Sequence, residues 1–275
     1  MIKFAYGYRT DPITLLALRM GMALPFFLWM SWRSSRATDR PPLSRGDWGL
    51  IAVLGFLGYY LGSFMDYLGL QYVAAGLGRL ILFLYPTIVV LLSFVFLKKK
   101  VHARELVALG ICYAGLTLVL ARALEAHNPN LLLGATLVFV GGCSYAIYLV
   151  AGTEVTRRIG SLRFSAYATA FACFLCIAQF FVLRPIASLD MPWQVYGFTA
   201  IIATLSTVAP VIMTAEALRR IGASRVATIG ALGPVSTIFL SWLGLDEMMT
   251  LLQLAGVALV LGGVLLVNTN PNTRN

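Results

Sequence analysis

Charged residues are scarce in this chain of 275 residues: Asp, Glu, Lys and Arg together make up 12% of it, against about 25% in a typical soluble domain. Hydrophobic residues make up 59%, which is more than a chain of this length can bury in a soluble core. The abundance of Leu, Ile, Val and Phe equally excludes a disordered chain. The composition therefore predicts a protein whose apolar side chains face lipid.

Histidine and cysteine are also rare. His102 and His127 fall in predicted loops, and the chain has no H-E-x-x-H motif, phosphate-binding glycine loop or nucleophile with a matching base. Cys173 and Cys176 form a C-x-x-C, but no second Cys or His pair accompanies it, so we interpret both as small packing residues rather than a metal or redox site. The sequence predicts no enzyme, no cofactor and no metal.

Long apolar stretches are what the chain has instead. A helix of about 20 apolar residues crosses a hydrocarbon core about 30 Å thick. Nine stretches meet this requirement, at residues 13–32, 48–71, 76–97, 105–123, 131–152, 163–183, 193–215, 225–245 and 249–268. The loops between these stretches are short, so no residues remain to form a soluble domain. The predicted fold is all-α, a polytopic membrane helix bundle of nine spans.

The basic residues predict its orientation. Loops on the side of the C-terminus, with the C-terminal tail, hold 15 Lys and Arg, and the opposite side holds 5. Positive residues favour the cytoplasmic side, so we expect the C-terminus in the cytoplasm and, with nine spans, the N-terminus outside. This distribution also accounts for the net charge of +10 without a nucleic-acid partner.

An internal repeat is visible at an offset of 148 residues. Residues 70–120 and 218–268 align without a gap and are identical at 12 of 51 positions. Shared leucines are common in apolar chains, but the alignment also pairs Pro86 with Pro234 and Gly115 with Gly263. Coincidence is the alternative explanation of this alignment, and it would require two prolines in the middle of predicted spans to align by chance.

The offset pairs the first four spans with the last four, so the repeat unit has five spans and its two copies are inverted in the membrane. We predict a first repeat at 1–123 and a second at 131–268. The span 131–152 has no partner, and we expect about twenty residues of a first helix to be missing. Either the chain is shortened at its N-terminus, or it has nine genuine spans.

Two stretches carry a family resemblance. They are DYLGLQYVAAGL and RLILFLYPT at 66–77 and 79–87, and GLDEMMTLLQLAG with GGVLL at 244–256 and 262–266. On these residues the chain resembles the EamA-type members of the drug/metabolite transporter superfamily. It departs from the family in its missing first helix and in Gly78, where similar sequences have Glu.

The resemblance implies two inverted five-helix repeats, a multi-pass location in the bacterial inner membrane, and a secondary transporter that exports small metabolites such as amino acids. The expected partners are a small-molecule substrate and membrane lipid, and the oligomeric state stays open. A second interpretation is a nonfunctional or partner-dependent membrane scaffold, because the family's first helix helps to wall its cavity.

Three charges lie inside the predicted spans: Arg19, Asp66 and Arg79. A charge in hydrocarbon is costly and usually faces a partner or an aqueous cavity. All three fall within the outer third of their spans, so we predict that Asp66 pairs with Arg79 or Arg19. The pair is either structural or takes part directly in substrate or proton binding.

Polar side chains recur on the helical faces that the resemblance places around the cavity. We predict that the cavity lies between the halves and is lined by Tyr59, Ser63, Tyr85, Tyr145, Tyr148 and Thr207, with Asp66 and Arg79 as further substrate-binding candidates. For any one Ser or Thr the alternative is a hydrogen bond within the bundle.

Two prolines occupy matched mid-span positions of the repeat. Pro86 and Pro234 each remove one backbone hydrogen bond from a predicted helix. They are predicted hinges, with static bends as the alternative.

Overall fold

The chain is all-helical wherever the structure describes it. The computed structural model describes residues 10–36, 42–82, 129–213 and 251–268, with scattered further positions between 5 and 8 and between 84 and 118, and no strand occurs among them. Five helical stretches are long and apolar enough to cross a membrane: Pro12–Ser35, Arg45–Gly69, Leu131–Gly152, Ser161–Leu183 and Trp193–Met213. The predicted polytopic helix bundle is therefore confirmed. The predicted span 225–245 lies outside the described residues, so the count of nine stays a prediction.

The helices belong to two compact units. The first unit contains residues 1–67 and 147–220, and the second contains 68–146 and 221–275. Each unit draws on both predicted repeats, and the repeat boundaries remain predictions from sequence.

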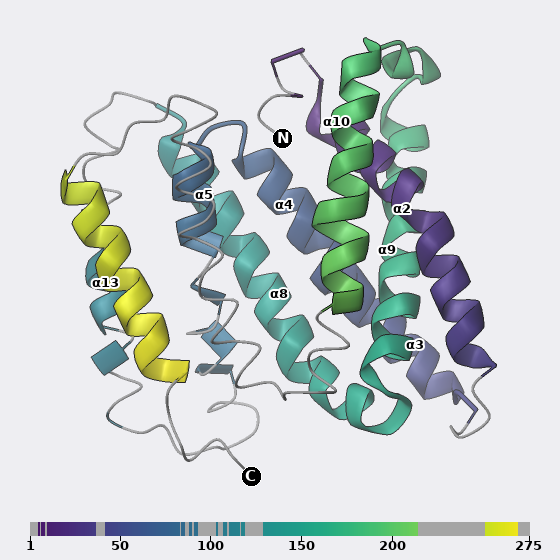
Figure 1. The fold of residues 1–275 in the computed structure, drawn as a ribbon, viewed down its shortest axis with the longest axis horizontal. Coiled ribbons are helices and arrows are strands. Elements are labelled where there is room, and N and C mark those ends of the chain that lie inside the picture. The colour runs from purple at the N-terminus through teal and green to yellow at the C-terminus, as the bar shows by residue number, and fades with distance from the viewer. Residues whose placement is uncertain are drawn as a thin grey trace. The chain divides into compact units, whose positions relative to one another are not determined.

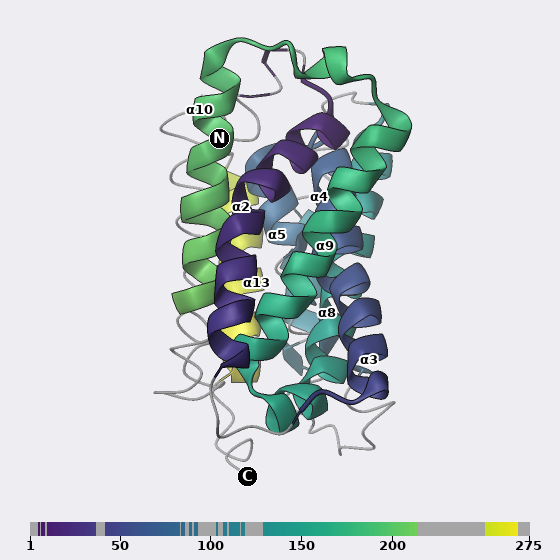
Figure 2. The same cartoon turned by 90° about the vertical axis from the view of Figure 1, so that its right-hand side faces the viewer.

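The first unit is built on two long antiparallel helices, α2 (Pro12–Ser35) and α9 (Ser161–Leu183), which pack against each other (Figures 1 and 2). Asp11 caps the N-terminus of helix α2, and its carboxylate accepts hydrogen bonds from the backbone N–H groups of Ile13 and Thr14 at 3.1 and 3.3 Å. Proline at the first helical position suits this start, since its missing N–H would have no helical partner.

Two further helices flank this pair. Helix α3 (Arg45–Gly55) continues through a π-helical segment, η1 (Phe56–Leu61), into α4 (Gly62–Gly69). A short 3₁₀ helix, η2 (Ile186–Leu189), precedes α10 (Trp193–Ala203), which continues into a second π-helical segment, η3 (Thr204–Val208). Helix α3 packs on α9, and α10 packs on α2.

The offset of 148 residues reappears in these bounds. It carries α3 onto 193–203, the range of α10, and it carries η1 onto 204–209, where η3 lies at Thr204–Val208. It carries α2 onto 160–183, and α9 is Ser161–Leu183. The packing is reciprocal as well, since each copy's flanking helix packs on the other copy's long helix. In the first unit the two sets of helices are therefore equivalent and inverted.

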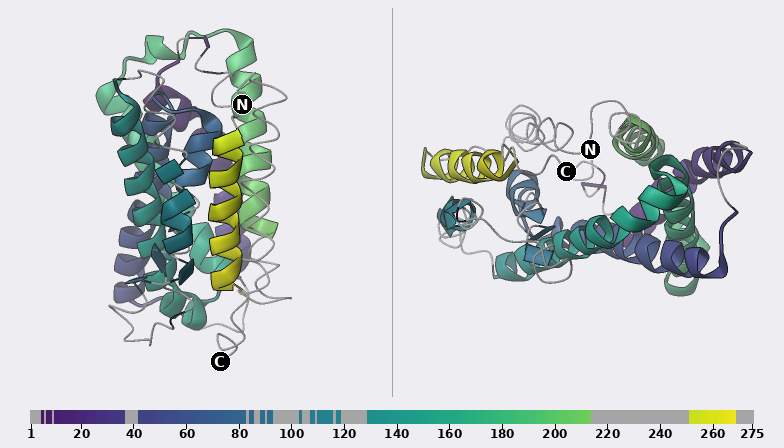
Figure 3. Two further views of the ribbon diagram at one scale, coloured as in Figure 1. Left: turned by 90° about the vertical axis from the view of Figure 1, so that its left-hand side faces the viewer. Right: turned by 90° about the horizontal axis from the view of Figure 1, so that it is seen from below.

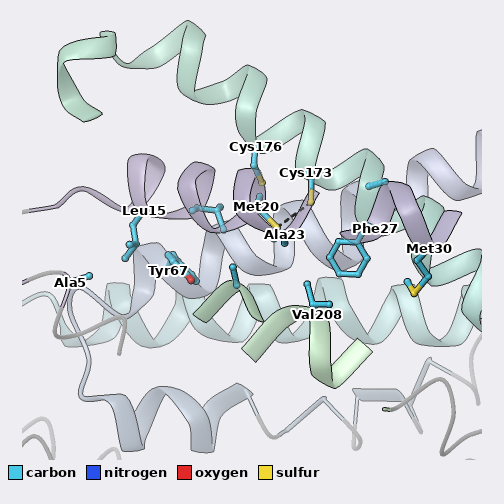
Figure 4. Close-up of a cluster of buried hydrophobic side chains, with 14 of the residues drawn as sticks. Ala5, Leu15, Met20, Ala23, Phe27, Met30, Tyr67, Cys173, Cys176 and Val208 are labelled. Carbon is cyan, nitrogen blue, oxygen red and sulfur yellow. Dashed lines mark hydrogen bonds between the residues drawn. The ribbon is translucent and has the colours of Figure 1, made fainter. Parts of the chain in front are cut away.

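The core of the first unit lies between α2 and α9 (Figure 4). Met20 of α2 meets Cys173 of α9, whose thiol donates to the Met20 sulfur at 3.7 Å. Cys173 and Cys176 are both buried and not in a disulfide, and they belong to this apolar cluster. The packing role predicted for the C-x-x-C is therefore confirmed.

An ion pair closes one end of the first unit. The Asp11 carboxylate accepts from Arg184 Nε at 3.0 Å and also bonds the Thr14 hydroxyl. Burial raises the pKa of the Asp11 carboxyl, but the hydrogen bonds from Thr14 and Arg184 outweigh it and hold the pKa below its usual value. Stability from this charge is therefore complete above the unfolded pKa of about 3.9 and is lost as pH falls through the folded value.

We expect Asp11→Asn to lower stability at pH 7 by less than about 1 kcal/mol, because the pair is partly exposed. Asn keeps the helix cap, so the substitution removes only the charge. The difference from wild type should shrink as the pH falls through the lowered pKa of the folded Asp11 carboxyl, as measured in thermal melts in detergent. Asp190→Asn, in the loop before α10, is the control, and an Asp11→Asn effect that persists at low pH would contradict the assignment.

The second unit contains α5 (Ala75–Leu82), the first part of α8 (Leu131–Ile159) and α13 (Leu251–Asn268), a single straight helix (Figure 3). Small residues let the helices of this unit approach each other closely. A Cβ on Gly69 would lie 2.7 Å from the carbonyl oxygen of Gly134, and a Cβ on Gly134 would lie 3.0 Å from the carbonyl oxygen of Gly69. Such contacts are typical of helix packing in membranes.

The same offset relates a second pair of close contacts in this unit. A Cβ on Gly115 would lie 2.5 Å from the carbonyl oxygen of Gly256, and one on Gly263 would lie 2.7 Å from that of Ala108. Each residue of one contact is 148 positions from its counterpart in the other. The aligned glycines therefore pack reciprocally against each other's segments.

We expect Gly263→Ala to destabilise the protein by about 1–3 kcal/mol, because the added methyl meets backbone that cannot turn aside. Gly262 is the matched control, since a Cβ there meets nothing within 4 Å. Gly262→Ala should leave the melting temperature unchanged or raise it. Equal effects of the two substitutions would contradict the packing described.

Candidate polar site in the membrane helices

Arg19 lies at the meeting point of α2, α4 and η3. Its Nε donates to the Thr207 hydroxyl at 2.8 Å and its Nη1 to the Tyr67 hydroxyl at 3.1 Å. The guanidinium carbon also lies 5.3 Å from the centre of the Tyr67 ring, a cation–π contact. Asp66, which is buried, interacts electrostatically with Arg19. A positive charge in a membrane helix is thus held in place by two hydroxyls and an aromatic ring.

Thr207 can hold Arg19 because of the local geometry of η3. Its hydroxyl donates to the carbonyl of Ile202, five residues earlier, at 3.1 Å and accepts from Arg19 at the same time. A hydroxyl oxygen can take both roles at once. The π-helical segment, the threonine and the arginine therefore form one continuous chain of hydrogen bonds.

An aromatic cluster lies elsewhere in the first unit. The rings of Tyr59 and Tyr148 meet edge to face with centres 5.1 Å apart, and the Tyr148 hydroxyl donates to that of Tyr59 at 3.3 Å. Phe164 stacks on Tyr148 at 5.5 Å. Gly58 makes room for the Tyr148 ring, because a Cβ at position 58 would lie 2.4 Å from its Cγ.

Tyr85 and Tyr145 form a similar pair in the second unit. Their rings meet edge to face with centres 5.4 Å apart, and both side chains are partly buried. The structure thus brings four of the predicted tyrosines together in two pairs. Their convergence on a single cavity stays a prediction.

The remaining predicted site residues are placed as follows. Ser63 is partly buried on α4, and Arg79 is partly buried on α5. Which arginine pairs directly with Asp66 stays a prediction. The predicted hinges Pro86 and Pro234 lie outside the described residues.

Sequence reasoning left three residues out of the candidate site: Arg19, Tyr67 and Phe164. Arg19 was identified as a charge within a predicted span, but it was predicted only as a partner of Asp66 and not as a substrate-binding residue. An intramembrane arginine is itself a signal, because its five donors must all find acceptors away from water. Tyr67 follows Tyr59, Ser63 and Asp66 on one polar face at helical spacing, but it was not named as a candidate site residue. Phe164 gave no separate signal in this apolar chain.

Comparison with known proteins places the chain in a family. The sequence profile of the EamA-like transporter family matches residues 1–121 and 132–269. The chain is 30% identical over 279 aligned residues to the uncharacterized transporter YcbK of Bacillus subtilis, an alignment that covers 99% of this chain and 87% of that protein. It is 26% identical to the uncharacterized transporter sll1319 of Synechocystis, over 92% of this chain and 78% of that protein.

The fold has a counterpart among solved structures. One crystal structure superposes with a TM-score of 0.62 and 16% sequence identity, covering 96% of this chain and 89% of the matched chain. At that identity the likeness concerns the fold alone. The helical bundle, the two profile matches and the relatives together show that this chain is a multi-pass membrane protein and a member of the EamA-like transporter family.

Proposed function

We propose that the chain is a secondary transporter of small metabolites such as amino acids or related compounds, not an enzyme, and that it works by alternating access between two inverted repeats. In this proposal the protein resides in the bacterial inner membrane with its C-terminus in the cytoplasm, and net transport is out of the cell. Pro86 and Pro234 act as matched hinges.

The observation that carries the proposal is the hydrogen-bonded Arg19 in a membrane-spanning helix. Its guanidinium offers further N–H groups beyond those bonded to Thr207 and Tyr67, and a carboxylate is the ligand that such a planar fork matches best. Tyrosine rings with polar tips, as in the Tyr59–Tyr148 pair, suit the apolar part of a small amphipathic solute.

A transport screen tests the proposal. The purified chain is reconstituted in liposomes, and uptake of each radiolabelled standard amino acid is compared with uptake by protein-free liposomes. We expect at least one amino acid to enter faster with the protein present. A folded chain that moves none of them would contradict the proposed substrate class and favour the membrane scaffold.

A further inference from the structure

The two π-helical segments of the first unit occupy equivalent positions. Adding 148 to η1 gives 204–209, and η3 is Thr204–Val208. In each segment the closing N–H bonds to a carbonyl five residues earlier: Gly62 to Leu57, and Ala209 to Thr204. π-Helical turns are rare and often mark functional sites, so their recurrence at one offset calls for a common role.

Both segments carry a candidate site residue at the same position of the repeat. Tyr59 of η1 and Thr207 of η3 are 148 residues apart. Tyr59 contacts Tyr148, and Thr207 bonds Arg19. In both segments this shared position makes a polar contact with another helix of the unit.

A π-helical turn contains one residue more than an α-helical turn. The extra residue changes which face its side chains share with the rest of the helix, while the helix continues beyond it. It also leaves carbonyls without their usual partners. The hydroxyl of Thr207 donates to the carbonyl of Ile202 and accepts from Arg19, and these two bonds together fix its orientation.

We infer that η1 and η3 are the paired positioning elements of the solute site, which set the register that brings Tyr59 to Tyr148 and Thr207 to Arg19. The inference rests on the proposed transport function. The two elements present different chemistry, a hydroxyl that holds a cation in η3 and an aromatic pair beside η1. They suit a solute with an anionic group and an apolar group.

Deleting one residue from each segment tests the inference. Leu57 and Leu205 are equivalent in the repeat, and neither is a candidate site residue. Without the extra residue each turn can close with α-helical bonds, so the flanking helices keep their register. We expect each deletion variant to stay folded and to melt cooperatively, while uptake of the amino acid selected in the screen falls at least about tenfold. Leu57→Ala and Leu205→Ala, at full length, are the controls and should transport normally.

Full-length variants at Thr207 decide the matter if a deletion prevents folding. Thr207→Val removes the hydroxyl and should raise the apparent KM at least about tenfold, whereas Thr207→Ser, which keeps the hydroxyl, should restore most of the lost affinity. Deletion variants that fold and transport like wild type, or a Thr207→Val variant with an unchanged KM, would overturn the inference. Failure of the wild-type chain to transport would instead refute the proposed function.

Discussion

Replacing Arg19 by Gln is expected to lower transport at least about tenfold, because each hydrogen bond from a charged donor is worth about 1.5–3 kcal/mol and 1.4 kcal/mol is a factor of ten. Gln is shorter than Arg and lacks the two separate nitrogens, Nε and Nη1, that donate to Thr207 and Tyr67, and it carries no charge for an anionic solute. The fold should survive, since the Thr207 hydroxyl keeps its bond to the Ile202 carbonyl. Initial uptake rates in proteoliposomes and thermal melts of the same preparation measure the two effects.

Arg19→Lys and Arg33→Gln are the companion variants. Lysine keeps the charge but lacks the planar fork that reaches both hydroxyls, so we expect an intermediate loss. Arg33 lies on the same helix but is exposed, with its guanidinium over the Trp29 ring at 5.6 Å. Its replacement should leave transport unchanged. Equal rates for wild type and Arg19→Gln would remove Arg19 from the solute site.

Replacing Gly58 by Ala is expected to cost about 1–3 kcal/mol of stability and to lower transport as well. The added methyl would lie 2.4 Å from Cγ and 2.8 Å from Cβ of Tyr148. These atoms lie next to the backbone of α8, so the ring cannot simply turn aside. The displaced ring would lose its stacking on Phe164 and its hydrogen bond to Tyr59.

Gly49 provides the matched control for this substitution. It is exposed, lies in α3, which leads directly into η1, and has nothing within 4 Å of an added Cβ. Gly49→Ala should leave stability and transport unchanged. A Gly58→Ala protein that melts at the wild-type temperature would show that the Tyr148 ring does not lie against position 58.

The lengths of the membrane helices could be predicted from the sequence. The predicted spans 13–32, 163–183 and 193–215 correspond to Pro12–Ser35, Ser161–Leu183 and Trp193–Met213. These agree because a helix that crosses hydrocarbon needs about 20 apolar residues whatever its neighbours are. The offset of 148 residues was visible from identical residues, which include Pro86 with Pro234 and Gly115 with Gly263.

The contacts within the candidate site could not be predicted in this way. Arg19 and Thr207 are 188 residues apart, and hydropathy says nothing about which side chains meet across helices. The π-helical segments were equally hidden, because one extra residue in a long apolar helix hardly changes its composition. Tyr59 and Thr207 were both candidate site residues because their side chains are polar. Their equivalence in the repeat becomes visible only when 148 is added to the number of Tyr59.

Counterflow tests the proposed exchange of solute between two membrane faces most directly. Proteoliposomes with the wild-type chain are loaded with the unlabelled amino acid selected in the screen and diluted into a trace of the labelled form, without nucleotide. We predict a transient accumulation of label above its equilibrium level, absent in protein-free liposomes. Label that enters a folded, reconstituted preparation no faster than protein-free liposomes would contradict the proposed transport function.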